Sequence, residues 1–166
     1  KPLLDKATKV YSIANPGHTD AYEFQDGKLL MGKLTPLNDM RWQNIVERMG
    51  KDTFTEHLNQ SSLVAFVNWT MMPYMSEIWK MVQSEVLDHQ PRPELSDRKT
   101  LFFDLCDPQK RPNEDILEAL NLIAAFQPYF SVTLGLNEKE AHEIGEVLGL
   151  QAASDSKEGL VDLVEQ

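Results

Sequence analysis

Hydrophobic and polar positions follow two different periods along the chain, and the change falls after its first third. In the first part, apolar residues alternate with polar ones over short stretches, which is typical of β-strands. We expect strands over residues 9–14, 20–24 and 28–32. Asp26-Gly27 predicts the two-residue turn of a hairpin, because both residue types accept a positive φ angle. Residues 1–36 are therefore interpreted as a small β segment.

Helical spacing begins after this segment. Asn38 is expected to cap a helix that runs to Met49 and stops at Gly50. Its apolar residues recur every three or four positions, as one buried helix face requires. A shorter helix is expected over residues 53–58.

Three apolar runs then alternate with helical stretches. The runs cover residues 62–68, 100–107 and 130–136, and helices are expected over residues 73–87, 113–127, 137–148 and 157–164. This order is typical of a parallel sheet whose strands are joined by helical crossovers. The sequence thus predicts an α/β fold with a partly parallel, Rossmann-like part over residues 37–166 and an N-terminal β hairpin segment.

Composition narrows the functional classes. The 166 residues suit a domain with a real core. Lys and Arg total 16 against 26 Asp and Glu, a net charge of −10, which argues against nucleic-acid or anionic-membrane partners. No apolar run is long enough to span a bilayer. The single cysteine, Cys106, predicts neither disulfides nor a cysteine zinc site; we expect it to be buried in a cytoplasmic protein.

Polar residues follow each of the three apolar runs. Asn68 ends the first, Asp104 and Asp107 end the second, and Asn137 follows the third. Ligands of open α/β sheets bind at the carboxyl ends of the strands, so we expect these side chains to share one cleft. Each also has an ordinary role as a turn or cap residue.

Asn137 and Glu140 have the spacing of a capping box, in which the two side chains bond each other's backbone amides. A helix N-terminus is also an anion site, and a carboxylate beside it can hold Mg²⁺ through water. Both interpretations stay open at this point, and they are compatible.

Two stretches carry a resemblance to a known family. LFFDLCDPQKRPNEDILEAL (residues 101–120) and FSVTLGLNEKEAHEIGEVLG (residues 130–149) resemble the central part of PfkB-type, ribokinase-like carbohydrate kinases. In that family one strand ends in an Asp-rich loop, often with Arg-Pro nearby, and a later strand ends in Asn-x-x-Glu. The similarity covers roughly residues 62–150, and the N-terminal β segment would correspond to lid strands that cover the sugar.

The resemblance implies ATP and Mg²⁺ as cofactors and a sugar as substrate. Asn137 and Glu140 would organise Mg²⁺ and the nucleotide phosphates, with Glu140 reaching the metal through water. Asp104, Asp107 and Arg111 would lie near the phosphate-transfer cleft, where Arg111 would neutralise charge. Asn68 would lie on the sugar side.

The chain also departs from the family pattern. It contains neither the Gly-Ala-Gly-Asp motif that carries the catalytic aspartate nor the di-glycine sugar motif. No catalytic residue is therefore assigned, and we expect an inactive central fragment of a sugar kinase. A nucleoside kinase of the same fold and a non-catalytic α/β binding module are the alternatives. The exposed lid strands would let two copies pair as a homodimer.

Overall fold

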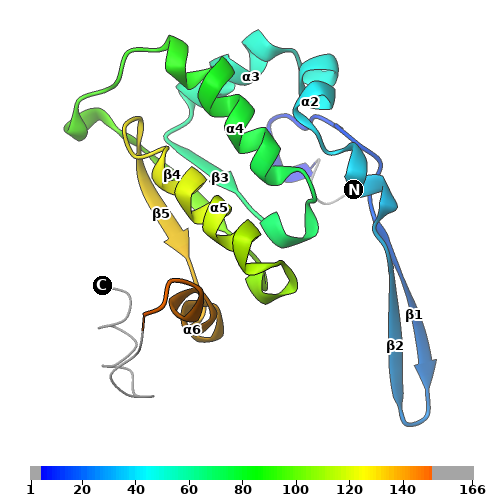
Figure 1. Ribbon diagram of the computed structural model, residues 1–166. Helices are drawn as coiled ribbons and strands as arrows, with labels where there is room; N and C mark the ends of the chain where they lie inside the picture. Colours follow the sequence, from blue (N-terminus) through cyan, green and yellow to red (C-terminus); the bar gives the residue numbers. More distant parts are fainter. Residues whose placement is uncertain (1–4, 151–166) are drawn as a thin grey trace.

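A three-stranded parallel sheet forms the centre of the molecule (Figure 1). The computed structural model describes residues 5–150. The sheet has the order β3 (Leu63–Phe66), β4 (Lys99–Asp104) and β5 (Phe130–Gly135). Leu101 in the middle strand pairs with Val64 on one side and Val132 on the other. The predicted α/β fold with parallel strands and helical crossovers is confirmed.

Helices provide the crossovers and cover one face of the sheet. α4 (Met75–Glu85) joins β3 to β4, α5 (Asn113–Ala124) joins β4 to β5, and α6 (Glu138–Val147) follows β5. Figure 1 shows α4 and α5 side by side across the sheet. α4 buries Met75, Ile78, Trp79 and Val82, the spacing of one helix face.

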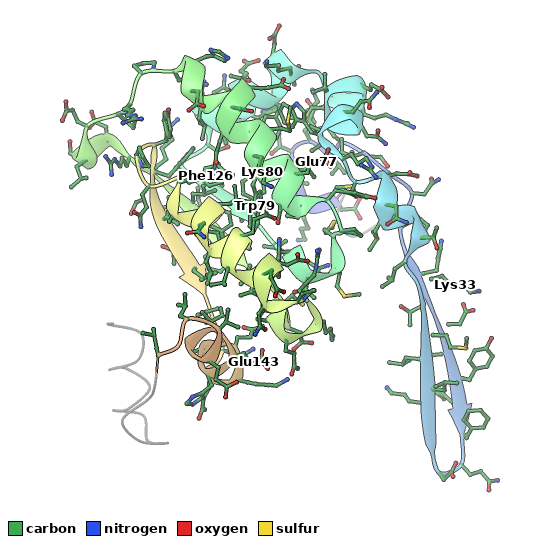
Figure 2. The ribbon with its side chains drawn as sticks, viewed as in Figure 1. Lys33, Glu77, Trp79, Lys80, Phe126 and Glu143 are labelled. Carbon is green, nitrogen blue, oxygen red and sulfur yellow. The ribbon has the colours of Figure 1, made fainter. Side chains whose placement is uncertain are left out.

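An aromatic cluster fills the space between the sheet and these helices. The rings of Trp79 and Phe103 meet edge to face, with centroids 4.9 Å apart at 83°. Phe66 and Phe126 pack against Phe103 with centroid distances of 5.7 and 5.6 Å. Trp79 and Phe126, labelled in Figure 2, are fully buried. This cluster fixes the strands, and hence the loops at their ends.

Residues 42–60 form two further α-helices, and the first starts later than its sequence predicts. α2 (Trp42–Met49) and α3 (Lys51–Gln60) are joined at Gly50, whose φ of +88° suits glycine. Asn38 does not cap α2. It lies in a 3₁₀ turn, η1 (Thr35–Asp39), which has a proline in its first turn, and Arg41 takes the cap position in extended conformation.

The N-terminal hairpin consists of β1 (His18–Phe24) and β2 (Gly27–Lys33), and it extends away from the sheet (Figure 1). Its turn is one residue earlier than predicted. Phe24 pairs with Gly27, so Gln25 and Asp26 form the turn, and neither has a positive φ. Without a positive φ the turn is not of type I′ or II′, and glycine is favoured at the fourth position of a type I turn, here Gly27.

Residues 9–14 do not form the predicted strand. Side chains hold this segment instead of a β ladder. The Tyr11 hydroxyl lies 3.1 Å from His57 Nε2 on α3, and Ile13 packs against the core. The helix expected over residues 157–164 lies outside the described residues. Within residues 5–150, every helix is too short or too polar to cross a membrane.

Candidate functional site

The loops that follow the three parallel strands meet at one edge of the sheet. Asn68 comes after β3, and its backbone N–H donates to Asp104 Oδ2 at the end of β4, over 3.4 Å. The backbone N–H of Asp107 donates to Glu140 Oε1 on α6, over 2.9 Å. The structure therefore brings together the polar residues that the sequence places at the strand ends, because parallel strands carry their ends to the same edge.

Asn137 and Glu140 form a complete capping box at the start of α6. Asn137 Oδ1 accepts from the Glu140 N–H, and Glu140 Oε2 accepts from the Asn137 N–H, each over 3.0 Å. Glu140 is only 6% exposed, although it is a glutamate. Its second oxygen receives the Asp107 N–H, so Glu140 also fastens the loop after β4 to α6. This extra bond goes beyond what a helix cap requires.

The loop after β4 contains two consecutive residues in the left-handed region. Cys106 has a φ of +62° and Asp107 a φ of +60°, a region that glycine adopts most readily and that Asp tolerates better than Cys does. Cys106 is exposed, and the expectation that it is buried is wrong, because this backbone turn carries the residue out of the strand. The pKa of the thiol is raised, first by partial burial of its sulfur and then by Asp104 and Asp107. A raised pKa disfavours the thiolate that a nucleophile needs.

Asp107 forms an ion pair with Lys110 in the 3₁₀ turn η5 (Pro108–Lys110). Lys110 Nζ donates to Asp107 Oδ2 over 2.8 Å. This hydrogen bond lowers the pKa of Asp107 and raises the pKa of Lys110. Both groups therefore stay charged near neutral pH.

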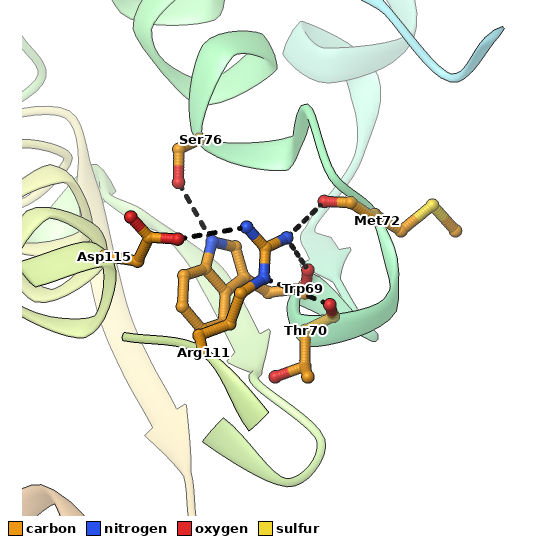
Figure 3. Close-up of polar contacts among 6 residues, drawn as sticks. All are labelled: Trp69, Thr70, Met72, Ser76, Arg111 and Asp115. Carbon is orange, nitrogen blue, oxygen red and sulfur yellow. Dashed lines mark hydrogen bonds and ion pairs between the residues drawn. The ribbon is translucent and has the colours of Figure 1, made fainter. Parts of the chain in front are cut away.

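Arg111 clamps the loop after β3 to the start of α5 (Figure 3). Its guanidinium donates to the backbone oxygens of Trp69, Thr70 and Met72 over 3.1, 3.1 and 2.8 Å. It also lies 3.4 Å from Asp115 Oδ2 and 4.7 Å from the Trp69 ring centroid. Its side chain is 17% exposed. The predicted role of Arg111 in neutralising phosphate charge therefore competes with four hydrogen-bonding partners and the Trp69 ring.

A groove of about 420 Å³ separates the base of the hairpin from the strand-end loops. Its polar lining comes from distant segments that the sequence gives no reason to group. These residues are Thr35 and Asn38 near the hairpin, Thr70 after β3, and Lys110 after β4. Leu34, Met71 and Pro73 complete the wall. Only the tertiary structure could identify this lining.

Two buried side-chain oxygens in the loop after β3 lack partners among the described residues. They are Asn68 Oδ1 and Thr70 Oγ1, and Thr70 is also a lining residue of the groove. Buried polar atoms without partners are uncommon in proteins and indicate that a further polar group belongs beside them.

The residues do not form a direct metal site. No cluster of three or more His, Cys, Asp or Glu side chains positioned for a metal ion occurs within residues 5–150. Both oxygens of Glu140 already accept backbone N–H groups. The site therefore fits at most a metal that keeps its water shell and is held mainly by substrate phosphates, as is usual for Mg²⁺.

Comparison with known proteins identifies the family. A family model described as prokaryotic ketohexokinase matches residues 5–164. A protein named ketohexokinase from Haloferax volcanii is 27% identical over 148 residues, which is 89% of this chain and 38% of the relative. The chain thus spans well under half the length of this curated relative. No solved structure gives a significant match.

These matches confirm the resemblance to carbohydrate kinases that was based on residues 101–120 and 130–149. The chain belongs to the prokaryotic ketohexokinase family.

Proposed function

We propose that the full-length protein transfers the γ-phosphoryl group of ATP to a hydroxyl group of a ketose sugar. The observation that carries this proposal is the groove between the hairpin base and the strand-end loops. It lies beside the Asn68, Asp104 and Asp107 loops in a chain of the prokaryotic ketohexokinase family. The name of the Haloferax volcanii relative, ketohexokinase, supports a ketohexose as the first substrate to test.

The groove suits a small polyhydroxyl compound. A volume of about 420 Å³ lies in the range of small-molecule sites. Thr35 and Asn38 offer a hydroxyl and an amide group, while Leu34 and Met71 offer an apolar surface to the carbon skeleton. The unpartnered oxygens of Asn68 and Thr70 support a polar ligand on this side.

The start of α6 is the proposed place for the nucleotide phosphates. Helix N-termini attract anions through their free N–H groups and the helix dipole. Asn137 holds this end in shape, and Glu140 joins it to the Asp107 loop. We assign Glu140 a contact with Mg²⁺ only through water, because its oxygens are bonded to the backbone. When bound, Mg²⁺ would neutralise phosphate charge.

In the proposed reaction, the sugar oxygen forms a bond to the γ-phosphorus as the bond from that phosphorus to the ADP oxygen breaks. The hydroxyl proton must pass to a general base. The family motif that carries this base is absent from the 166 residues. We therefore propose that the 166-residue chain by itself is inactive, and that Asp104 and Asp107 only shape the cleft.

An assay of the full-length protein with Mg-ATP tests the proposal. The panel should contain ketoses, aldoses and nucleosides, with ADP release as the readout. We expect turnover with a ketohexose and none with the isolated 166-residue chain. Turnover confined to adenosine or another nucleoside would replace the sugar proposal with the nucleoside-kinase alternative. A full-length protein that neither binds nor phosphorylates any of these compounds would refute both.

We also propose that two copies of the protein associate through the hairpin. One face of the hairpin carries Tyr22, Phe24, Leu29 and Met31, which are 49–63% exposed. An exposed apolar ribbon with free edges favours pairing with a second copy. Sedimentation of the full-length protein should show a dimer that Leu29→Lys dissociates. A wild-type monomer at high concentration would contradict this proposal.

A further inference from the structure

Among the described residues 5–150, Lys110 is the only charged residue that lines the groove. The remaining lining residues are neutral hydroxyl, amide or apolar side chains. We propose that Lys110, and not Arg111, supplies the positive charge that binds the phosphoryl group as it reaches the sugar. This inference rests on the proposed kinase function and adds a residue with a specific task to it.

Arg111 is the residue that the family resemblance favours for this task, and its geometry disfavours it. Three backbone oxygens and Asp115 surround its guanidinium group, which also lies over the Trp69 ring. A phosphoryl group would have to displace contacts that hold two loops together. Breaking such buried, charge-assisted hydrogen bonds is costly. Arg111 is therefore a structural clamp.

Lys110 lies between the two proposed subsites. Its side chain contributes to the groove, where we place the sugar. Its partner Asp107 lies 2.8 Å away, and the Asp107 N–H is bonded to Glu140 at the start of α6, where we place the nucleotide phosphates. A phosphoryl group that moves from nucleotide to sugar would pass this ammonium group.

The ammonium group has the capacity for this contact. It carries three N–H donors, and one of them points to Asp107. No second acceptor for Lys110 occurs among the described residues, and its side chain is 55% exposed. The bond to Asp107 raises the pKa of Lys110, so the group stays protonated. Lysine binds phosphate as a compact point charge.

The sugar is neutral before the reaction and carries a phosphate after it. A cation at the sugar end therefore interacts with the transferring group and the product more strongly than with the free sugar. Interactions that are stronger in the transition state raise kcat, whereas those made equally with the substrate change KM. Lys110 should accordingly affect kcat and product binding, and leave sugar binding unchanged.

Calorimetric titration of the full-length protein with D-fructose and with fructose monophosphate tests this assignment. Lys110→Met should weaken binding of the monophosphate by roughly 10-fold or more, as loss of a charge-assisted contact predicts. Binding of fructose should stay within about twofold, since no charge is lost against a neutral ligand. Lys110→Arg should restore most of the affinity for the monophosphate. In the ATP assay, Lys110→Met should lower kcat and leave the KM for fructose unchanged.

Lys80→Met is the matched control. Lys80 on α4, labelled in Figure 2, forms a similar exposed ion pair with Glu118 on α5, and it is not a lining residue of the groove. This variant should bind both ligands as the wild type does.

Three results would overturn the proposal. If Lys110→Met leaves monophosphate binding unchanged in an active protein, the Lys110 assignment is wrong and the kinase function stands. If Lys110→Met and Asp107→Asn weaken fructose and its monophosphate equally, the ion pair only shapes the loop. A wild-type protein that binds neither ligand and turns over no sugar would instead refute the kinase function, and the assignment with it.

Discussion

The hairpin and the parallel sheet are both β structures, but opposite principles hold them together. Every residue of β1 and β2 except Asp20 is exposed, and one ion pair, Asp20–Lys33, links their side chains near the base. In β4, by contrast, Leu101 and Phe103 are almost completely buried under α4 and α5. The hairpin satisfies its backbone hydrogen bonds without burying a core. An isolated two-stranded hairpin is marginally stable for this reason.

This difference shapes the groove, because the two regions meet there. The wall formed by the strand-end loops belongs to the part of the molecule with a core, and Arg111 holds it by donating to the backbone oxygens of Thr70 and Met72. The other wall, at Thr35 and Asn38, comes directly after the hairpin in the sequence, and the hairpin has no core. A ligand or a second copy would supply the apolar contacts that the hairpin lacks. The comparison thus predicts stability effects on one wall and binding effects on the other.

The largest difference between the two regions should appear when one phenylalanine in each is replaced by alanine. Phe103→Ala should lower the free energy of unfolding by about 3–5 kcal/mol, because it leaves a cavity in the aromatic cluster. Phe24→Ala, in the hairpin, should change it by less than about 0.5 kcal/mol in a monomer. Urea unfolding followed by tryptophan fluorescence measures both. Equal losses would show that the hairpin does have a packed partner.

A smaller effect should follow from changing the clamp on one wall of the groove. Arg111→Lys should destabilise the protein by about 2–3 kcal/mol, because lysine cannot donate to three separate carbonyl groups in this geometry. Asn38→Ala on the other wall should leave stability nearly unchanged and weaken sugar binding. Thermal unfolding with and without fructose measures both. If both variants keep wild-type sugar binding, the sugar binds outside this groove.

The next effect concerns the capping box. Asn137→Ala should cost about 1 kcal/mol, since one helix N–H loses its acceptor, and Asn137→Asp should restore most of it. If Asn137 only caps the helix, affinity for Mg-ATP stays the same once the protein is folded. A further loss of nucleotide affinity in the alanine variant would support the proposed phosphate role. Nucleotide titration at a temperature well below unfolding distinguishes the two.

The smallest effect is the pH dependence of the Asp107–Lys110 pair, since both groups are exposed. Because Lys110 lowers the pKa of Asp107 in the folded state, this pair stabilises the protein above the ordinary carboxyl range. The contribution is lost as the pH falls below about 4 and Asp107 is protonated. Asp107→Asn should remove this part of the acid dependence, as urea unfolding at several pH values would show. An unchanged profile would mean that the pair contributes nothing.

The periodic parts of the fold could be predicted because their signals are local. The i, i+3, i+4 pattern of Ile78, Trp79 and Val82 fixes α4, and Asn137 with Glu140 marks the start of α6. The errors fall where neighbours decide. Residues 9–14 alternate apolar and polar side chains as a strand does, but no strand pairs with them. Asn38 does not cap a helix, because it lies inside a 3₁₀ turn. Cys106 is exposed because it and Asp107 both adopt left-handed φ angles just after β4 ends.

From residue 18 to residue 147, the sequence by itself determined the order of strands and α-helices, the capping box and the strand-end residues Asn68, Asp104 and Asp107. It did so because periodicity and caps depend on residues a few positions apart. Only the tertiary structure decided that Arg111 is bound by backbone oxygens and that Glu140 reaches the Asp107 N–H. It also placed Lys110 opposite Asn38 in one groove. These contacts join segments more than 30 residues apart, and the packing of helices on the sheet sets them.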